Sequence, residues 1–376
     1  MVDSRNWFAE IPETRRRRFL ASQRDGFGIE VHGQTLINFS GNDYLGLSCH
    51  PDVCQAAQHA CAHTVGSGAS RLVSGDDPAL HRLEEKLARW KGYEACLIVG
   101  SGMLANLGLI QALANRHTHL FSDKLNHASL VDGARLSGAA IHRYAHLNTD
   151  QLASQLEKFP AEKRIIVSDG IFSMDGDCAD VHALLALAEA HDTLLVIDDA
   201  HGIGTVGENG TGLTSAHNIA GHARLIEVGT FGKAFGGYGA FILGTRSLVE
   251  GLRQRQRTMI YSTALPLAMI AAAETALSLI QSGEQVSRLH RNLDRFKAGV
   301  SGLGFMDSDT AIQPLVIGAD NQALAMSKTL AESGFFVSAI RPPTVPENTA
   351  RLRFTLSASH HTEQIGRLTD CLRRLL

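Results

Sequence analysis

The middle third of this 376-residue chain repeats one pattern, in which short apolar runs alternate with segments of helical spacing. The apolar runs that predict strands lie at 95–100, at the start of 119–130, and at 164–170, 194–202 and 223–232. Helices are predicted between them, for example at 181–192. Strands that are apolar throughout and alternate with helices are typical of a mostly parallel sheet with helices on both faces. The sequence therefore predicts an α/β fold.

The segments on either side of the middle third lack its regular alternation of strands and helices, which suggests that the chain has three parts. We predict an N-terminal helix and short strands in 1–42, a large domain with the parallel sheet in 43–275, and a smaller C-terminal α+β domain in 276–376. Residues 1–25 are expected to form a short amphipathic helix. The basic cluster at 15–18 is then a solvated helix face or, alternatively, a contact for a substrate phosphate.

Charge and cysteine content exclude several classes of protein. Lys and Arg number 35 against 38 Asp and Glu, a net charge of −3, so neither nucleic acid nor an anionic membrane is expected as a partner. The six cysteines show no Cys-x-x-Cys pair and no metal-ligand spacing, which favours reduced thiols without disulfides. No run approaches the roughly 18 apolar residues of a membrane span, and the N-terminus has no apolar signal core. We expect a soluble, cytoplasmic protein.

Polar residues stand at the carboxyl ends of the predicted strands. In open parallel sheets, ligands gather at this edge because the loops begin there. The residues at these ends are Ser101, Asp169, Asp198, His201, Thr230 and Lys233. We therefore expect the functional site at this edge.

Lys233 lies in the stretch EVGTFGKAFGGYGA (227–240), between an apolar run and a glycine-rich turn. Lysine is uncommon in so apolar a segment without a partner or a role. A phosphate loop would need a glycine five residues before Gly232 and Ser or Thr after the lysine, but the chain has Glu227 and Ala234 there. Lys233 is therefore predicted to be a nucleophile or a Schiff-base lysine. The alternative is a surface lysine in a loop.

Asp198 follows the apolar run LLVI, so its carboxylate needs a cationic or hydrogen-bonding partner, and it can stabilise a protonated ring nitrogen. His201 can hydrogen-bond a neighbouring oxygen or serve structure alone. Residues 101–103 separate a strand from a helix, where free N–H groups and the helix dipole attract a phosphate. A lysine, a buried aspartate and a phosphate cradle are the parts that hold pyridoxal 5′-phosphate.

One competing motif, GIGTVG at 202–207, matches the dinucleotide fingerprint G-x-G-x-x-G. The residues that follow, at 208–212, are typical of a loop, so no helix N-terminus is available for a pyrophosphate. Asp198 and Asp199 would also place negative charge beside it. A nicotinamide cofactor is therefore disfavoured. The histidines form no His-Glu-x-x-His motif, and we predict no metal.

Eight segments, spread over nearly the whole chain, carry a family resemblance. They are NFSGNDYLGLS (38–48), GSGASRLVSG (66–75), FSDKLNHASLVDGARLS (121–137), DGIFSMDGD (169–177), DDAHGIGTVG (198–207), TFGKAFGGYGA (230–240), YSTALP (261–266) and IRPPTVPENTARLRFTLSASH (340–360). Together they resemble the α-oxoamine synthases, pyridoxal-phosphate enzymes with the aspartate aminotransferase-type fold. Several motifs in the same order are more specific than any one alone.

The resemblance implies a role for each matching residue. Lys233 would form the Schiff base with the cofactor and later move the substrate Cα proton. His127 would stack on the cofactor ring, Asp198 would pair with the ring nitrogen, and His201, assisted by Ser173, would bind the phenolic oxygen. The residues implied for the phosphate are Gly102, Met103 and Thr230, with Ser262 and Thr263 from a second subunit.

The substrate roles are also implied by the resemblance. Arg353 would bind the amino-acid carboxylate, and Asn42 would lie near the substrate. Arg351 is the less favoured choice, although both arginines lie on one face of their strand. Two departures from the family pattern are Met103, where relatives often have an aromatic residue, and the additional glycines after Lys233.

The segments IRPPTVP and TARLRFTLSASH favour one branch of the family. That branch is an acyltransferase that condenses L-alanine with a pimeloyl thioester, on coenzyme A or an acyl carrier protein, and releases CO2 and the thiol in biotin biosynthesis. The alternative is a relative that uses glycine, of the 2-amino-3-ketobutyrate or 5-aminolevulinate type. The family also implies a homodimer with shared active sites.

Overall fold

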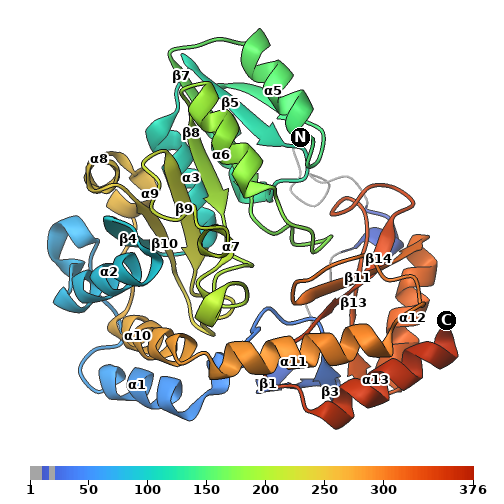
Figure 1. Cartoon of the computed structure of the whole chain (residues 1–376). Coiled ribbons are helices and arrows are strands. Elements are labelled where there is room, and N and C mark those ends of the chain that lie inside the picture. The colour runs from blue at the N-terminus through green and yellow to red at the C-terminus, as the bar shows by residue number, and fades with distance from the viewer. Residues whose placement is uncertain (1–10, 17–21) are drawn as a thin grey trace, which may run out of the picture.

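A seven-stranded sheet forms the centre of the computed structural model, which describes residues 11–16 and 22–376 (Figure 1). The strand order is β4-β10-β9-β8-β7-β5-β6, and neighbours are parallel except for β10, which is antiparallel to both β4 and β9. The strands are β4 (Ala95–Val99), β5 (Thr118–Asp123), β6 (Ala140–Tyr144), β7 (Lys163–Asp169), β8 (Leu194–Asp198), β9 (Leu225–Thr230) and β10 (Ala240–Gly244). The predicted α/β fold with a mostly parallel sheet is confirmed.

Helices cover both faces of this sheet because its strands are apolar on both sides. In β4, Leu97 and Val99 join one hydrophobic cluster, whereas Cys96 and Ile98 join the other. The first cluster includes residues of α3 (Gly102–Leu113), α4 (Ala128–Ser137), α8 (Arg246–Arg255) and α9 (Arg257–Ile260). The second includes residues of α2 (Pro78–Lys91), α5 (Thr149–Lys158), α6 (Val181–Ala190) and α10 (Leu267–Gln281). The carboxyl ends of the parallel strands remain open for a site.

The C-terminal part contains a three-stranded sheet, β11 (Ile312–Gly318), β14 (Ala350–Thr355) and β13 (Ser338–Ile340), in the order β11-β14-β13. Helices α11 (Glu284–Gly299), α12 (Asp320–Glu332) and α13 (Thr362–Leu375) surround it (Figure 1). The N-terminal strands β1 (Ser22–Asp25), β2 (Gly28–Val31) and β3 (Gln34–Asn38) form a second small sheet with β12 (Phe335–Phe336). The N-terminal segment is therefore joined to the C-terminal part by strand pairing. Helix α1 (Pro51–Cys61) packs on α10.

The helix predicted within 1–25 is wrong for the part that the structure describes; residues 1–10 and 17–21 lie outside it. Glu13–Arg15 is a single 3-10 turn, and β1 begins at Ser22. Residues 22–25 form a strand and not a helix because β1 pairs with β2 along its whole length across the turn at Gly26. Of the basic cluster, Arg15 binds Glu347, with 2.6 Å between Nη2 and Oε2.

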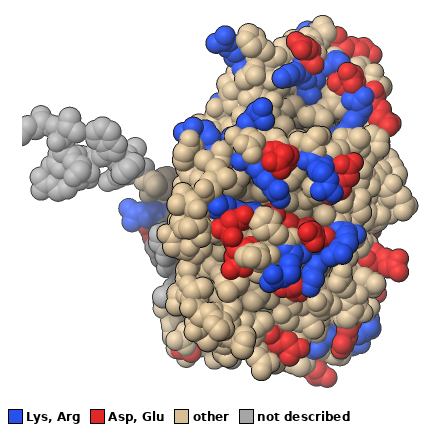
Figure 2. Space-filling view, turned by 90° about the vertical axis from the view of Figure 1, so that its left-hand side faces the viewer, with Lys and Arg blue, Asp and Glu red and all other residues tan. Residues whose placement is uncertain are grey.

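No helix in residues 11–16 and 22–376 is long and apolar enough to cross a membrane. On the face shown in Figure 2, basic and acidic side chains lie next to one another and form no block of one sign. This mixture agrees with the small net charge of −3. Single-sign fields of the kind that attract nucleic acid are not visible on this face.

Two of the glycines that follow Lys233 have structural reasons. Gly236 has φ of +66° and Gly239 has φ of +115°, both in the region that L side chains rarely adopt. A Cβ on Gly236 would lie 2.1 Å from the backbone nitrogen of Ser48. At Gly237, by contrast, the nearest atom to a built Cβ is the Phe231 carbonyl oxygen at 3.6 Å.

We predict that Gly236→Ala lowers the free energy of unfolding by about 2–4 kcal/mol, because strain at positive φ and the overlap with Ser48 add together. Gly237→Ala is the matched control and should change it by less than about 1 kcal/mol. Thermal and urea unfolding of the two variants measure the difference. Equal stability of the two variants would show that the turn does not depend on the contact with Ser48.

Candidate active site

A cavity of about 200 Å³ lies at the carboxyl ends of β7, β8 and β9. Its lining brings together most of the predicted residues, from segments that are far apart in the sequence. The lining residues are Gly102, Met103, His127, Ser129, Asp169, Ser173, Asp198, Ala200, His201, Thr230 and Lys233. The expectation of a site at this edge of the sheet agrees with this geometry.

Lys233 is half-buried in the turn after β9. Burial lowers its pKa to about 8, and the positive charge of Arg353 adds to this, while Asp198 and Asp169 oppose it. Within the described residues, its Nζ has no hydrogen bond or ion pair. The amine is therefore free, and a much larger fraction of it is neutral at pH 7 to 8 than in an ordinary lysine. This is the state that a nucleophilic lysine needs.

Asp198 ends β8 and is only 8% exposed. Its Oδ2 accepts a hydrogen bond from Asn106 Nδ2 at 2.6 Å, and its Oδ1 accepts one from the Ala200 N–H at 3.0 Å. In the part of the chain that the structure describes, no cationic side chain forms an ion pair with this carboxylate. A buried carboxylate held by neutral donors and facing a cavity is suited to a cationic ligand group.

His201 lines the same cavity, and its Nδ1 lies 2.7 Å from the hydroxyl of Tyr44. Burial lowers the pKa of His201 well below its ordinary value, and the positive charges of Lys233 and Arg353 lower it further, so the ring is neutral. We assign the hydrogen bond as donated by Tyr44. Nε2 then carries the ring proton and can donate it to an oxygen in the cavity.

His127 caps helix α4 and lines the cavity. Its backbone N–H donates to Asp169 Oδ2 at 2.7 Å, and its Nδ1 lies 2.8 Å from Ser129 Oγ. Asp169 is the last residue of β7, so the strand fixes the position of the histidine. The ring is thereby held at the cavity from both its backbone and its side chain.

The start of α3 forms another side of the cavity. Ser101 is the N-cap, and its Oγ accepts the Leu104 N–H at 3.3 Å. The N–H groups of Gly102 and Met103 have no partner inside the helix, as is general for a first turn. Thr230 is adjacent, since a Cβ on Gly102 would lie 4.0 Å from Thr230 Oγ1. The Thr230 hydroxyl itself donates to the Gly239 carbonyl at 3.0 Å. Two free N–H groups and the helix dipole make an anion site.

The structure separates the two arginines of β14 by their partners. Arg351 forms an ion pair with Asp175. Arg353 donates from Nε to the Ser173 carbonyl at 2.5 Å and from Nη2 to Asn42 Oδ1 at 3.2 Å, and it has no carboxylate partner within the described residues. Arg353 is thus the arginine whose charge remains available for a carboxylate ligand.

Four predicted residues are not in the lining of this cavity: Asn42 and Arg353, which contact each other, and Ser262 and Thr263. Ser262 and Thr263 lie in the segment between α9 and α10, where Thr263 forms a β-bridge with Ser70. Their predicted role requires a second subunit and stays a prediction.

Several residues that shape the site have no role predicted from the sequence. They are Tyr44, Asn106, Ser129 and Asp169. Asn106 had one usable signal, because a short amide side chain in the mostly apolar helix GMLANLGLIQAL needs a hydrogen-bond partner when it is buried. Asp169 stood at a strand end, as Asp198 did. The contact between Tyr44 and His201 spans 157 positions and has no signal in local sequence.

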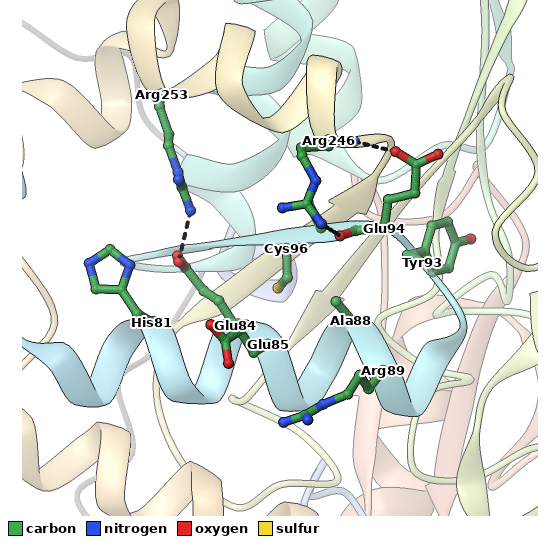
Figure 3. Close-up of a pocket in the computed structure, with 11 residues that line it drawn as sticks. His81, Glu84, Glu85, Ala88, Arg89, Tyr93, Glu94, Cys96, Arg246 and Arg253 are labelled. Atoms are coloured by element: carbon green, nitrogen blue, oxygen red, sulfur yellow. Dashed lines mark hydrogen bonds and ion pairs between the residues drawn. The ribbon is translucent and has the colours of Figure 1, made fainter.

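Larger hollows occur elsewhere in the fold but contain none of the predicted residues. One of about 410 Å³ lies between α2, β4 and α8 (Figure 3). The charged side chains there have hydrogen-bond partners: Arg253 Nη2 lies 3.1 Å from Glu84 Oε2, Glu94 Oε2 accepts the backbone N–H of Arg246 at 3.0 Å, and Arg246 Nη2 donates to the Glu94 carbonyl at 3.3 Å. These pairs leave little free charge for a ligand.

The fold and the cavity are together typical of one class of protein: α/β enzymes with a lysine amine beside an anion site and a buried carboxylate. The model of the family "Aminotransferase class I and II" matches residues 34–372. The chain belongs to this family. It is 45% identical to 8-amino-7-oxononanoate synthase of Saccharophagus degradans, over 96% of this chain and 92% of that protein.

Solved structures show the same fold. One of 8-amino-7-oxononanoate synthase from Francisella tularensis has a TM-score of 0.78 at 29% identity and covers 90% of this chain and 97% of its own. A high-resolution structure of SPT (serine palmitoyltransferase) with PLP has a TM-score of 0.90 at 28% identity and covers 95% of this chain and 91% of its own. The predicted membership of the α-oxoamine synthases is confirmed by these relatives.

Proposed function

We propose that this protein is a pyridoxal-phosphate-dependent acyltransferase. It condenses L-alanine with a pimeloyl thioester and forms 8-amino-7-oxononanoate, CO2 and the free thiol in biotin biosynthesis. The observation that carries the proposal is the 45% identity, over 96% of the chain, to a relative named for this product. Both the coenzyme A thioester and the carrier-protein thioester remain candidates for the acyl donor.

The residues of the cavity fit pyridoxal phosphate. Lys233 offers an unpaired amine whose pKa burial lowers to about 8, which suits a covalent link to the cofactor aldehyde. The N–H groups of Gly102 and Met103 offer donors for the phosphate, and Thr230 would join them if its hydroxyl turned from the Gly239 carbonyl to the ligand. Asp198 offers a buried anion, without a cationic side-chain partner in the described segments, for the ring nitrogen. His127 would stack on the ring, with Ser173 and His201 at the phenolic oxygen.

The chain's own side chains then have distinct tasks in the reaction. When bound, the cofactor supplies an electron sink for the charge that remains when alanine loses its proton or its CO2. As a free amine, Lys233 would take the Cα proton of the substrate and later return one. Arg353 fixes the substrate carboxylate beside Asn42. Asp198 keeps the ring nitrogen protonated, and neutral His201 donates a hydrogen bond from Nε2.

The assembly and location are also part of the proposal. A homodimer would bring Ser262 and Thr263 of a second subunit to the phosphate. The apolar side chains of Leu72 and Val73, which are 61% and 79% exposed, support a contact between copies. The proposed domains, 43–275 and 276–376 with the segment 1–42, would place Lys233 and Arg353 on different domains. A cytoplasmic location is supported by the six cysteines, all of them free thiols.

Turnover of substrate pairs tests the reaction. The purified protein is incubated with L-alanine and pimeloyl-CoA, and 8-amino-7-oxononanoate and free thiol are quantified beside reactions with glycine and with shorter acyl-CoAs. We expect a clear preference for the pimeloyl chain, and side activity with glycine because one methyl group discriminates by only about 1–3 kcal/mol. Equal rates with acetyl-CoA and glycine would instead support the glycine-using alternative.

The pH dependence of cofactor uptake tests the state of Lys233. Because the neutral amine attacks the aldehyde, the uptake rate of the cofactor-free protein should rise with pH and level off above about 8, the pKa of Lys233. The lowered pKa of Lys233 also affects stability. Between pH 8 and pH 10.5, approximately, Lys233 binds fewer protons in the folded chain than in the unfolded chain. Over this range, the contribution of Lys233 to the free energy of unfolding therefore increases as the pH rises. Stopped-flow absorbance measures the uptake. A midpoint near 10.5 would show an ordinary lysine.

A further inference from the structure

His146 lies between two carboxylates at the edge of the proposed site. It follows β6, and its Nδ1 is 3.1 Å from Asp123 Oδ1 while its Nε2 is 2.8 Å from Asp177 Oδ2. Its ring meets Phe172 edge to face, with centroids 4.4 Å apart. Asp123 is the last residue of β5 and is 1% exposed. The histidine therefore links the central sheet to the segment that contains Asp177.

That segment is a closed hairpin, residues 171–178, which we call the 171–178 hairpin. It is held by a β-bridge between Ile171 and Cys178 and by a hydrogen bond from the Phe172 N–H to the Asp177 carbonyl at 3.0 Å. It begins two residues after Asp169, and its Ser173 lines the cavity. A shift of the hairpin would therefore move a residue of the site.

The other side of the 171–178 hairpin binds the C-terminal part of the chain. Its Ser173 carbonyl accepts from Arg353 Nε at 2.5 Å, and Arg351 pairs with its Asp175. Its Gly176 carbonyl accepts from Ser308 Oγ at 2.8 Å. The hairpin is thus clamped between His146 on the sheet side and the arginine strand β14 on the other.

Both ring nitrogens of His146 face carboxylate oxygens, so both contacts are hydrogen bonds only when the ring is protonated. Burial by itself would lower the pKa of His146, but the hydrogen bonds to Asp123 and Asp177 outweigh it and raise the pKa to about 10. Asp123 comes from β5 and Asp177 from the hairpin; in the described part of the chain they are the charged groups in contact with the ring. The ring is cationic at neutral pH.

We propose that His146 is a positioning residue: as an imidazolium between Asp123 and Asp177, it fixes the 171–178 hairpin and through it the direction of Arg353 toward the amino-acid carboxylate. This inference rests on the proposed function for the role of Arg353, but the bridge itself does not. No contact between His146 and substrate is involved. A neutral side chain at 146 can donate to only one of the two carboxylates. Asp123 keeps the backbone N–H groups of Leu125 and Leu147, so within the described residues Asp177 is the carboxylate that would lose its donor.

His146→Gln tests the contacts of His146 with Asp123 and Asp177. The amide of glutamine has an NH2 group that can donate to one carboxylate and a carbonyl oxygen that cannot donate to the other. We expect the KM for L-alanine to rise about tenfold, the effect of one lost charge-assisted hydrogen bond, with kcat nearly unchanged. Hydrogen exchange of the 171–178 hairpin should accelerate in the same variant, with or without cofactor. The double variant His146→Gln with Asp177→Asn provides rescue, because the amide at position 177 can donate to the carbonyl of the glutamine at position 146. In this variant, KM should return to within about threefold of the original value.

The matched control is His222→Gln, at the amino end of β9, where His222 Nε2 lies 3.1 Å from the single carboxylate of Glu189. It should leave KM and hairpin exchange unchanged. In ¹⁵N-histidine spectra at pH 8, where an ordinary histidine is neutral, His146 should still carry protons on both nitrogens.

Titration of His146 near 6.5, or unchanged hairpin exchange and KM in His146→Gln, would overturn the inference. The spectra and the exchange rates need no turnover. A protein that does not use alanine would therefore fail the proposed function, whereas a neutral His146 or an unaffected hairpin would fail this inference.

Discussion

Lys233→Ala is expected to lower kcat for the alanine condensation about 10,000-fold or more. The side chain has two tasks that no neighbour can take over, the covalent hold on the cofactor and proton transfer at the substrate Cα. Lys233 lines the cavity together with Asp198 and His127 and is the lysine among its lining residues. The fold should persist, because the Nζ makes no hydrogen bond or ion pair with the described residues and its removal relieves the burial of a charge. Steady-state turnover and thermal unfolding measure the two effects.

Lys328→Ala serves as the matched control for this variant. Lys328 is 80% exposed on α12 and reaches Glu332 only at 3.8 Å, so it should leave both kcat and stability within experimental error. Retention of more than about 1% of the original kcat by Lys233→Ala would assign the proton transfer to another group. The visible band of the bound cofactor should also shift in Lys233→Ala and remain in the control.

Asp198→Asn is expected to lower kcat about 100- to 1,000-fold, equivalent to about 3–4 kcal/mol of transition-state stabilisation. The amide keeps the size of the side chain but removes the negative charge that holds a proton on the cofactor ring nitrogen. Without that proton, the charge that develops at the substrate Cα is poorly stabilised. KM for alanine should change less than kcat, because the interaction matters most in the transition state.

Asp199→Asn is a control of the same chemistry one residue away. Burial raises the pKa of Asp199 well above its ordinary value, and the negative charge of Glu227 raises it further, while Lys91 opposes both; Asp199 is not among the residues that line the cavity. Its Oδ2 accepts the Leu213 N–H at 2.7 Å, which an amide oxygen can also do. We therefore expect less than about a tenfold change in kcat. Equal losses in the two variants would mean that the charge of Asp198 is not the cause.

Much of the central sheet could be predicted from the sequence because its strands are continuous apolar runs. The predicted run at 164–170 corresponds to β7 (Lys163–Asp169), for example. Strand β6 was not predicted: it lies at the edge of the sheet and carries exposed and polar residues, so neither continuous hydrophobicity nor a clean alternation marks it. Strand β10 directly follows the glycine turn, and its antiparallel direction depends on how that turn folds.

The candidate site was predictable to the extent that strand ends and motifs indicate it. Lys233 and Asp198 were predicted at the carboxyl ends of two strands, and both line the cavity there. The supporting contacts were not predictable, because Asn106 reaches Asp198 from a helix 92 positions away, and packing of α3 on the sheet decides that contact. Arg353 was favoured over Arg351 only through the family resemblance, because both arginines lie on one face of the strand; their different partners are visible only in the structure.

Covalent mapping of the cofactor tests the central claim most directly. The cofactor-loaded protein is reduced with borohydride, digested and analysed by peptide mass spectrometry. We predict that the reduced cofactor is attached to the peptide that contains Lys233, at close to one per chain, and that the visible band is bleached in parallel. Attachment at another lysine, or a protein that takes up no pyridoxal phosphate, would contradict the account.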